Sequence, residues 1–182
     1  MQPTVAQFQL PRAPAGQFQI MRDDDQDRPV PSGQVGYVAA YPEIYVEGPI
    51  DETTLVQLRG LVDANGLRSA KVQFNSRGGD LLAGLEIGYY LREKGFVTEV
   101  GAYNGGWGRF APAECYSACA VAYLGGQYRF MDPGSRIAVH RFTTDRPAGG
   151  ISPRDVEQET QALAGLLVAY IQQMGVDLAF FR

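Results

Sequence analysis

From Val35 onward the chain alternates between segments typical of β-strands and segments typical of α-helices. This alternation limits the possible folds more than any other feature of the sequence. Runs rich in β-branched and aromatic residues predict strands at 35–41, 44–48, 70–75, 96–100 and 136–140. Apolar residues at helical spacing predict helices at 52–65, 81–94, 117–124 and 153–174. Such alternation predicts an α/β fold with a largely parallel sheet and flanking helices.

The ends of the predicted helices carry capping residues. Asp51 and Asp80 stand where N-caps are expected, and Gly95 stands where the second helix should end. Ser152 followed by Pro153 opens the last helix, because serine caps the first amides and proline suits the first helical position. The order of the elements is therefore predicted independently of hydrophobic periodicity.

The composition is that of a globular domain and excludes several functional classes. The 182 residues are enough for one domain with a sizeable core, and 45% are hydrophobic against 20% charged. The net charge of -4 comes without a basic stripe, so we expect no nucleic-acid binding. No apolar run approaches the roughly 20 residues of a membrane span, and residues 1–30 show no apolar core of a signal peptide.

The two cysteines and the first 34 residues leave alternatives open. Cys115 and Cys119 lack the further ligands of a zinc site, so we expect no metal, and nothing indicates a cofactor. We interpret them as two small buried residues, because a disulfide across one helical turn would be tight. Residues 1–34 are expected to be an extension, either poorly ordered or an arm ordered by assembly, and 35–182 the domain.

Three features in a fixed order point to chemistry. The turn Asn75-Ser76-Arg77-Gly78-Gly79-Asp80 follows a predicted strand, Ser117 begins a predicted helix, and His140, the only histidine, ends a predicted strand. Catalytic groups of α/β folds gather at the carboxyl ends of strands, so we expect all three at one edge of the sheet. Each feature alone also has a structural interpretation, since a lone histidine or a small serine under a helix is common.

Together these residues are the parts of a serine hydrolase. A serine hydroxyl needs a base, and His140 is the side chain whose pKa suits that task near neutral pH. The Ala118 amide at the helix start, and free amides at Gly78 and Gly79, could stabilise a developing oxyanion. Glycines also allow a turn with positive φ and a close approach of substrate.

The segments 74–80, 116–120 and 136–140, with Gly84 and Gly88 on the intervening helix, resemble the ClpP/crotonase superfamily. They are most similar to its ClpP-like predicted periplasmic proteins of bacteria, and the resemblance spans about residues 44–175. It implies stacked ββα units with a largely parallel sheet. It further implies a serine peptidase-like hydrolase acting on a peptide or acyl substrate.

The resemblance also implies roles for individual residues. Ser117 corresponds to the nucleophile and His140 to the base, while the amides of Gly79 and Ala118, with Gly78 in the same turn, form the oxyanion hole. It implies a periplasmic or otherwise exported protein, with the cytoplasm as the alternative. It implies a homo-oligomer assembled through the helix after the histidine. That helix carries a broad apolar face, for which an intramolecular core is the alternative: Leu163, Leu166, Leu167, Tyr170 and Ile171.

The chain departs from the family pattern in two places. Residues 104–115 look inserted, and Trp107 and Phe110 in that segment either close the edge of the core, line an apolar substrate cleft or form a subunit contact. The family's triad aspartate is expected beyond Arg182, and Asp177 is the nearest later acid.

The missing acid leads to a prediction about the histidine. Asp145, in the segment after His140, is expected to be a solvated turn residue beside Arg146. We therefore predict that no carboxylate lies within hydrogen-bond reach of His140, and that a weak Ser-His dyad operates. Two alternatives to hydrolysis remain. One is a non-catalytic ClpP-like assembly or binding module, and the other a crotonase-like acyl-thioester enzyme that uses the oxyanion hole without Ser117.

Overall fold

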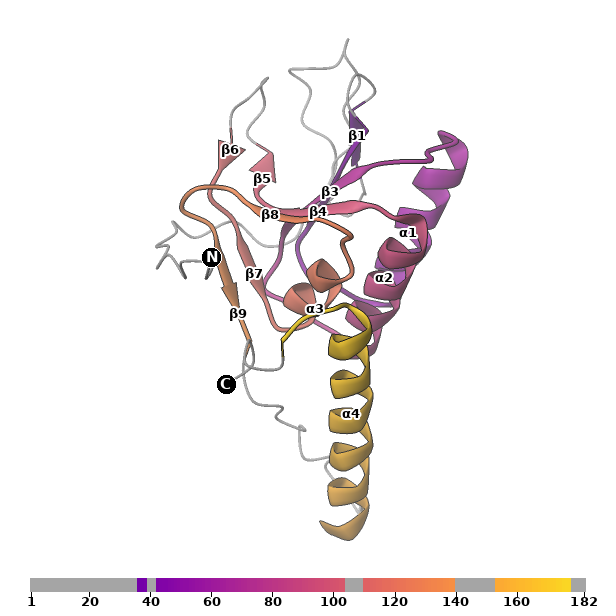
Figure 1. Cartoon of the computed structure of the whole chain (residues 1–182), viewed down its shortest axis with the longest axis vertical. Coiled ribbons are helices and arrows are strands. Elements are labelled where there is room, and N and C mark those ends of the chain that lie inside the picture. The colour runs from indigo at the N-terminus through magenta and orange to yellow at the C-terminus, as the bar shows by residue number, and fades with distance from the viewer. Residues whose placement is uncertain (1–35, 39–41, 104–109, 140–152, 178–182) are drawn as a thin grey trace. The chain divides into compact units, whose positions relative to one another are not determined.

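The computed structural model describes residues 36–38, 42–103, 110–139 and 153–177 (Figure 1). The chain divides into two compact units, 1–138 and 139–182, and each is described by itself. The predicted residues that lie outside the described ranges include the N-terminal extension 1–34, Trp107, His140 and Asp145.

The first unit is built on a five-stranded sheet. Its strands are ordered β1-β2-β3-β4-β8: β1 (Gly36–Val38), β2 (Glu43–Glu47), β3 (Lys71–Asn75), β4 (Val97–Val100) and β8 (Arg129–Met131). β1 pairs antiparallel with β2, and the remaining pairs are parallel. The predicted largely parallel α/β sheet is therefore confirmed. β8 was not among the predicted strands, because its three residues are too few to show a period.

Three helices accompany this sheet: α1 (Glu52–Ala64), α2 (Leu81–Lys94) and α3 (Ala118–Leu124). As predicted, the Asp51 carboxylate accepts the first amides of α1, and the Asp80 carboxylate accepts the Ala83 amide of α2. Gly95 adopts φ 67 directly after α2, a left-handed conformation that glycine adopts without strain. Local capping thus fixes these helix ends.

The two faces of the sheet differ in character. Ile44, Val72 and Phe74 on one face are fully buried, and Thr98 of the same face donates a hydrogen bond to the Tyr123 carbonyl of α3. Successive strand residues face opposite sides, so Tyr45, Gln73 and Glu99 lie on the other face. The apolar face is therefore the one that packs against the helices.

α2 and α3 approach so closely that glycine is required between them. A Cβ on Gly84 would lie 2.5 Å from the Ala118 carbonyl oxygen, and a Cβ on Gly125 would overlap the Gly88 carbonyl oxygen. Since Ala118 is the first residue of α3, this contact sets where α3 begins relative to α2 (Figure 1).

Four short strands form two small sheets outside the main one. β7 (Glu114–Tyr116) pairs in parallel with β9 (Arg136–Ala138), and β5 (Ala102–Tyr103) pairs antiparallel with β6 (Phe110–Ala111). β3 belongs to the main sheet and β7 and β9 to a second one, so the prediction of a single sheet was wrong. The ends of β3 and β7 nevertheless lie together, because Ser76 bridges to Cys115. Within the segment 104–115, which looks inserted in the sequence, Phe110–Ala111 forms β6 and Glu114 begins β7.

The second unit contains α4 (Pro153–Gln173), which begins at the predicted first-turn proline. Gly175 follows its end with φ 65. Of its apolar residues, Leu167, Tyr170 and Ile171 are buried, while Leu166 is 42% exposed. Among the described residues, no helix combines the length and apolar character needed to span a membrane.

Candidate functional site

Ser117 occupies a strained turn between β7 and α3. Its φ is positive, 55°, with ψ -122°. Among the described residues, every other residue with a positive φ is a glycine. Holding a serine there costs about 1–3 kcal/mol. Although Ser117 is the N-cap of α3, its side chain makes no capping hydrogen bond to the helix. A strained serine on a strand–turn–helix corner whose hydroxyl does not cap the helix is typical of a nucleophile.

A disulfide brackets this turn. Cys115 of β7 and Cys119 of α3 are bonded, with their Cα atoms 5.1 Å apart, within the usual range. Both side chains are buried as predicted, and they are bonded to each other, although a disulfide across one helical turn was expected to be tight. Cys115 does not lie on the helix, because the chain reverses at Ser117, and this reversal brings the two sulfurs together.

The glycine turn after β3 lies directly beside Ser117. A Cβ on Gly78 (φ 101) would lie 2.6 Å from the Tyr116 carbonyl oxygen, 2.8 Å from the Ser117 Cβ and 3.2 Å from the Ala118 nitrogen. A Cβ on Gly79 (φ 147) would overlap the backbone of Ile50. No side chain fits at either position: Gly78 is needed for the approach to Ser117, and Gly79 for the approach to Ile50.

The two glycine amides are in different situations. The Gly78 amide donates to the buried Ser76 Oγ at 3.0 Å, so the prediction that both amides are free was wrong for Gly78. Ile50 pairs with the turn through the Gly78 carbonyl (2.9 Å) and the Asp80 amide (2.8 Å). In a parallel bridge of this kind the amide of the middle residue points away from the partner. The Gly79 amide is thus directed away from Ile50.

The Ala118 amide belongs to the first turn of α3. The first hydrogen bond back into this helix comes from Val121, whose amide donates to the Ser117 carbonyl at 3.2 Å. Amides that precede such a bond have no partner within the helix. Since the Ala118 nitrogen also lies beside Gly78, it is a backbone donor close to both Ser117 and the glycine turn.

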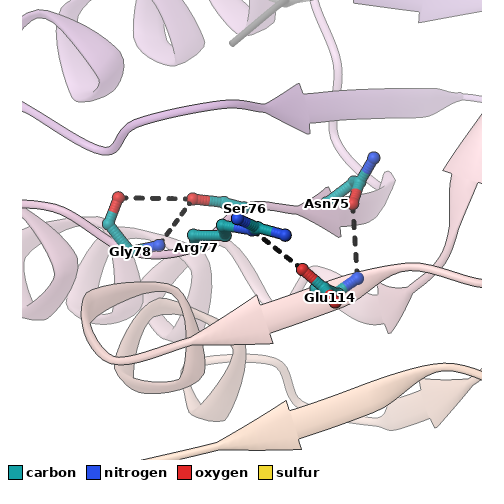
Figure 2. Close-up of polar contacts among 5 residues, drawn as sticks. All are labelled: Asn75, Ser76, Arg77, Gly78 and Glu114. Atoms are coloured by element: carbon teal, nitrogen blue, oxygen red, sulfur yellow. Dashed lines mark hydrogen bonds and ion pairs between the residues drawn. The ribbon is translucent and has the colours of Figure 1, made fainter. Parts of the chain in front are cut away.

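A polar clamp joins the glycine turn to β7. Figure 2 shows Glu114 facing Arg77 and Asn75: the Arg77 Nε donates to Glu114 Oε2 at 2.9 Å, and the Glu114 amide donates to Asn75 Oδ1 at 3.3 Å. The Ser76 amide donates to the Glu114 carbonyl, and the Tyr116 amide donates to the Ser76 carbonyl at 3.0 Å. The clamp fixes the turn against the strand that leads to Ser117.

Sequence reasoning did not find Glu114. Its carboxylate is 9% exposed, and its charged partner Arg77 stands 37 residues earlier in the chain, so no local pattern marks the pair. Burial, and after it the Glu114 carboxylate, raises the pKa of the Tyr116 phenol. This phenol, next to the candidate nucleophile, therefore stays protonated near neutral pH.

Two further predicted site residues are His140 and Asp177. The Ser117 amide donates to the Ala138 carbonyl of β9 at 2.9 Å, and the described part of this strand region ends at Val139, one residue before His140. Asp177 is exposed, in the second unit after α4. The role of His140 as the base stays a prediction, and so does the absence of a carboxylate that orients it. Within the described ranges no cluster of three or more His, Cys, Asp or Glu side chains could hold a metal.

Comparison with known proteins identifies the fold. No protein-family model matches the sequence, and no curated protein matches it significantly. Among solved structures, a ClpP1 mutant from Listeria monocytogenes has a TM-score of 0.54 and 17% identity, over 74% of this chain and 73% of that chain. ClpP1 from Listeria monocytogenes has a TM-score of 0.50 and 18% identity, over 72% of each chain. The chain therefore has a ClpP-like fold.

Proposed function

We propose that this protein is a serine peptidase-like hydrolase in which Ser117 attacks the carbonyl carbon of a peptide or acyl substrate. The observation that carries the proposal is the backbone of Ser117: a positive φ at a strand–turn–helix corner, directly beside a glycine turn. Strain at one residue that bears a reactive hydroxyl, with backbone amides close by, suits acyl transfer better than a purely structural role.

In the proposed mechanism His140 accepts the Ser117 proton as Oγ bonds to the carbonyl carbon. The amides of Gly79 and Ala118 donate to the oxyanion of the tetrahedral intermediate, and His140 then protonates the leaving group. Water hydrolyses the acyl-enzyme and restores the serine. Chain connectivity supports His140, because it stands two residues after Ala138, whose carbonyl accepts the Ser117 amide.

The proposed base works without an orienting acid. We expect no carboxylate within hydrogen-bond reach of His140, neither Asp145 nor Asp177. Loss of the orienting acid lowers turnover by about ten-thousand-fold in other triads. The proposed activity is therefore slow, and covalent labelling detects it more readily than turnover of a peptide.

Export and self-assembly are the proposed setting. Disulfides persist in oxidising compartments, so the Cys115–Cys119 bond supports a periplasmic or otherwise exported location. A homo-oligomer assembled through α4, on which Leu166 and Val168 are exposed, is the proposed assembly. Sedimentation analysis of the purified chain tests the assembly, and a purely monomeric species would contradict it.

A fluorophosphonate probe tests the proposed nucleophile. The probe should form a bond between Ser117 Oγ and phosphorus with loss of fluoride, and Ser117→Ala should abolish labelling. The exposed Ser69, at the N-terminal approach to β3, provides the control Ser69→Ala, which should label like the wild type. Equal labelling of Ser117→Ala would exclude the assignment. Absence of labelling in the wild type would favour the non-catalytic ClpP-like module.

A further inference from the structure

The disulfide and the strained serine form one local unit. Cys115 and Cys119 are four positions apart, and Ser117 stands midway between them. Both cysteine side chains are fully buried. The bond therefore closes a small ring of backbone that contains Ser117 and the Ala118 amide, the two groups at the centre of the proposed site.

The ring contains Ser117, whose positive φ is a conformation that a serine would otherwise avoid. A residue with a Cβ prefers negative φ, so a free chain at Ser117 gains energy by rotating out of φ 55. Rotation of the peptide units on either side of Ser117 would displace Cys115 relative to Cys119, within the short segment that the disulfide closes. While the sulfurs are bonded, this relaxation is blocked.

Other contacts also hold β7 and α3, the two elements on either side of the turn. The Ser117 amide binds the Ala138 carbonyl at 2.9 Å, Tyr116 binds Ser76 at 3.0 Å, and α3 packs on Gly84 of α2. These contacts do not pass through the sulfurs. Breaking the disulfide should therefore leave the sheet and helices folded and release mainly the conformation of Ser117.

We propose that Cys115 and Cys119 are positioning residues whose disulfide holds Ser117 and the Ala118 amide in the reactive arrangement, so that the protein reacts at Ser117 only in its oxidised form. This inference rests on the proposed hydrolase function. The bond forms by exchange with a partner disulfide, which takes up the two electrons and two protons of the two thiols. A dithiol reductant reverses it, leaving one hydrogen on each sulfur and becoming a disulfide itself.

The first experiment compares oxidised and reduced protein. The redox state is measured by intact mass after alkylation, and the rate of fluorophosphonate labelling at Ser117 is measured for each form. We expect labelling at least tenfold slower after reduction by dithiothreitol, with an unchanged circular dichroism spectrum and recovery on reoxidation. The variant Cys115→Ala/Cys119→Ala should label as slowly as reduced wild type, and reductant should not change its rate. Equal rates in the oxidised and reduced forms would overturn the proposal.

A second measurement does not depend on activity. Glycine adopts φ 55, ψ -122 without strain, so Ser117→Gly should raise Tm relative to Ser117→Ala. If the disulfide enforces the strain, this gain should be larger with the disulfide present than in the Cys115→Ala/Cys119→Ala background. An equal gain in both backgrounds would overturn the positioning role. If oxidised wild type does not label at all, the hydrolase proposal fails. The difference in the Tm gain between the two backgrounds then decides the role of the disulfide.

Discussion

At the residue scale, the site depends on two backbone conformations that most side chains avoid. Ser117 has φ 55, and Gly78, whose α-carbon lies beside it, has φ 101. Because Gly78 lacks a Cβ, the β3 turn approaches the Tyr116 carbonyl and the Ala118 amide closely. The Gly78 amide is itself bound to Ser76, so this glycine contributes space and shape, while Gly79 and Ala118 contribute the proposed donors.

Replacement of Gly78 tests this assignment. Gly78→Ala should abolish labelling of Ser117 and lower the free energy of unfolding by more than the roughly 1 kcal/mol expected for a positive φ alone, because its Cβ would lie 2.6 Å from a backbone oxygen. Gly66→Ala is the matched control, since Gly66 also has positive φ (60°) but would place its Cβ in open space. It should lose about 1 kcal/mol and label normally. Equal losses of stability would contradict the packing argument.

At the element scale, α3 is positioned by its neighbours more than by its own sequence. It has seven residues, too few to be stable in isolation. The disulfide ties its first turn to β7, and Gly84 of α2 lets the Ala118 carbonyl approach. The Ala118 amide therefore keeps its place beside Gly78 through contacts that come from two other elements.

A pair of glycine substitutions in helices tests the α2–α3 contact. Gly84→Ala should destabilise the protein and slow labelling of Ser117, because its Cβ would lie 2.5 Å from the Ala118 carbonyl oxygen. Gly60→Ala in α1 should instead stabilise by about 0.5–1 kcal/mol, because that Cβ meets nothing within 4 Å and alanine favours helix. Urea unfolding measures both. Stabilisation by Gly84→Ala would show that α3 does not require this close approach.

At the scale of the whole molecule, the main sheet carries a buried polar network on the face opposite the helices. Lys71 Nζ lies 2.7 Å from both Glu43 and Glu99, and the Gln73 amide donates to Glu99 at 2.7 Å. Asp132 lies at the end of the same face. Its burial, and after it the charge of Glu99, raises the pKa of Asp132 to about 6.

This network predicts a pH-dependent stability. The pKa of Asp132 is raised above its ordinary value of 3.8, so the folded protein holds this proton more tightly than the unfolded chain. The stability that this bound proton contributes is complete below about pH 4 and is lost as the pH rises through about 6. Asp132→Asn should therefore gain stability relative to wild type across that range, by on the order of 1–3 kcal/mol. Urea unfolding at pH 4 and pH 8 measures this difference, and the exposed Asp63→Asn should follow the wild type. A constant difference between Asp132→Asn and wild type would contradict the assignment.

The sequence by itself determined the features that depend on neighbours along the chain. Apolar spacing predicted α1 and α2, and a β-rich run predicted β3 between them. Asp51 and Asp80 marked the helix starts, because capping acts within one turn. Gly78 and Gly79 after β3 predicted a turn with positive φ, because glycine lacks the Cβ that disfavours this conformation. The helix after Ser117 was likewise predicted from its local apolar run.

Only the tertiary structure decided what depends on residues far apart. The β7–β9 sheet and the Arg77–Glu114 pair join segments separated by about 20 to 40 positions, and no local pattern records such pairings. The sequence placed the glycine turn and Ser117 at one edge, but the direct contact of Gly78 with Ser117 came only from the structure. The Cys115–Cys119 bond is short in sequence, yet it too required the structure. Its formation depends on the turn at Ser117, a conformation that local preferences oppose.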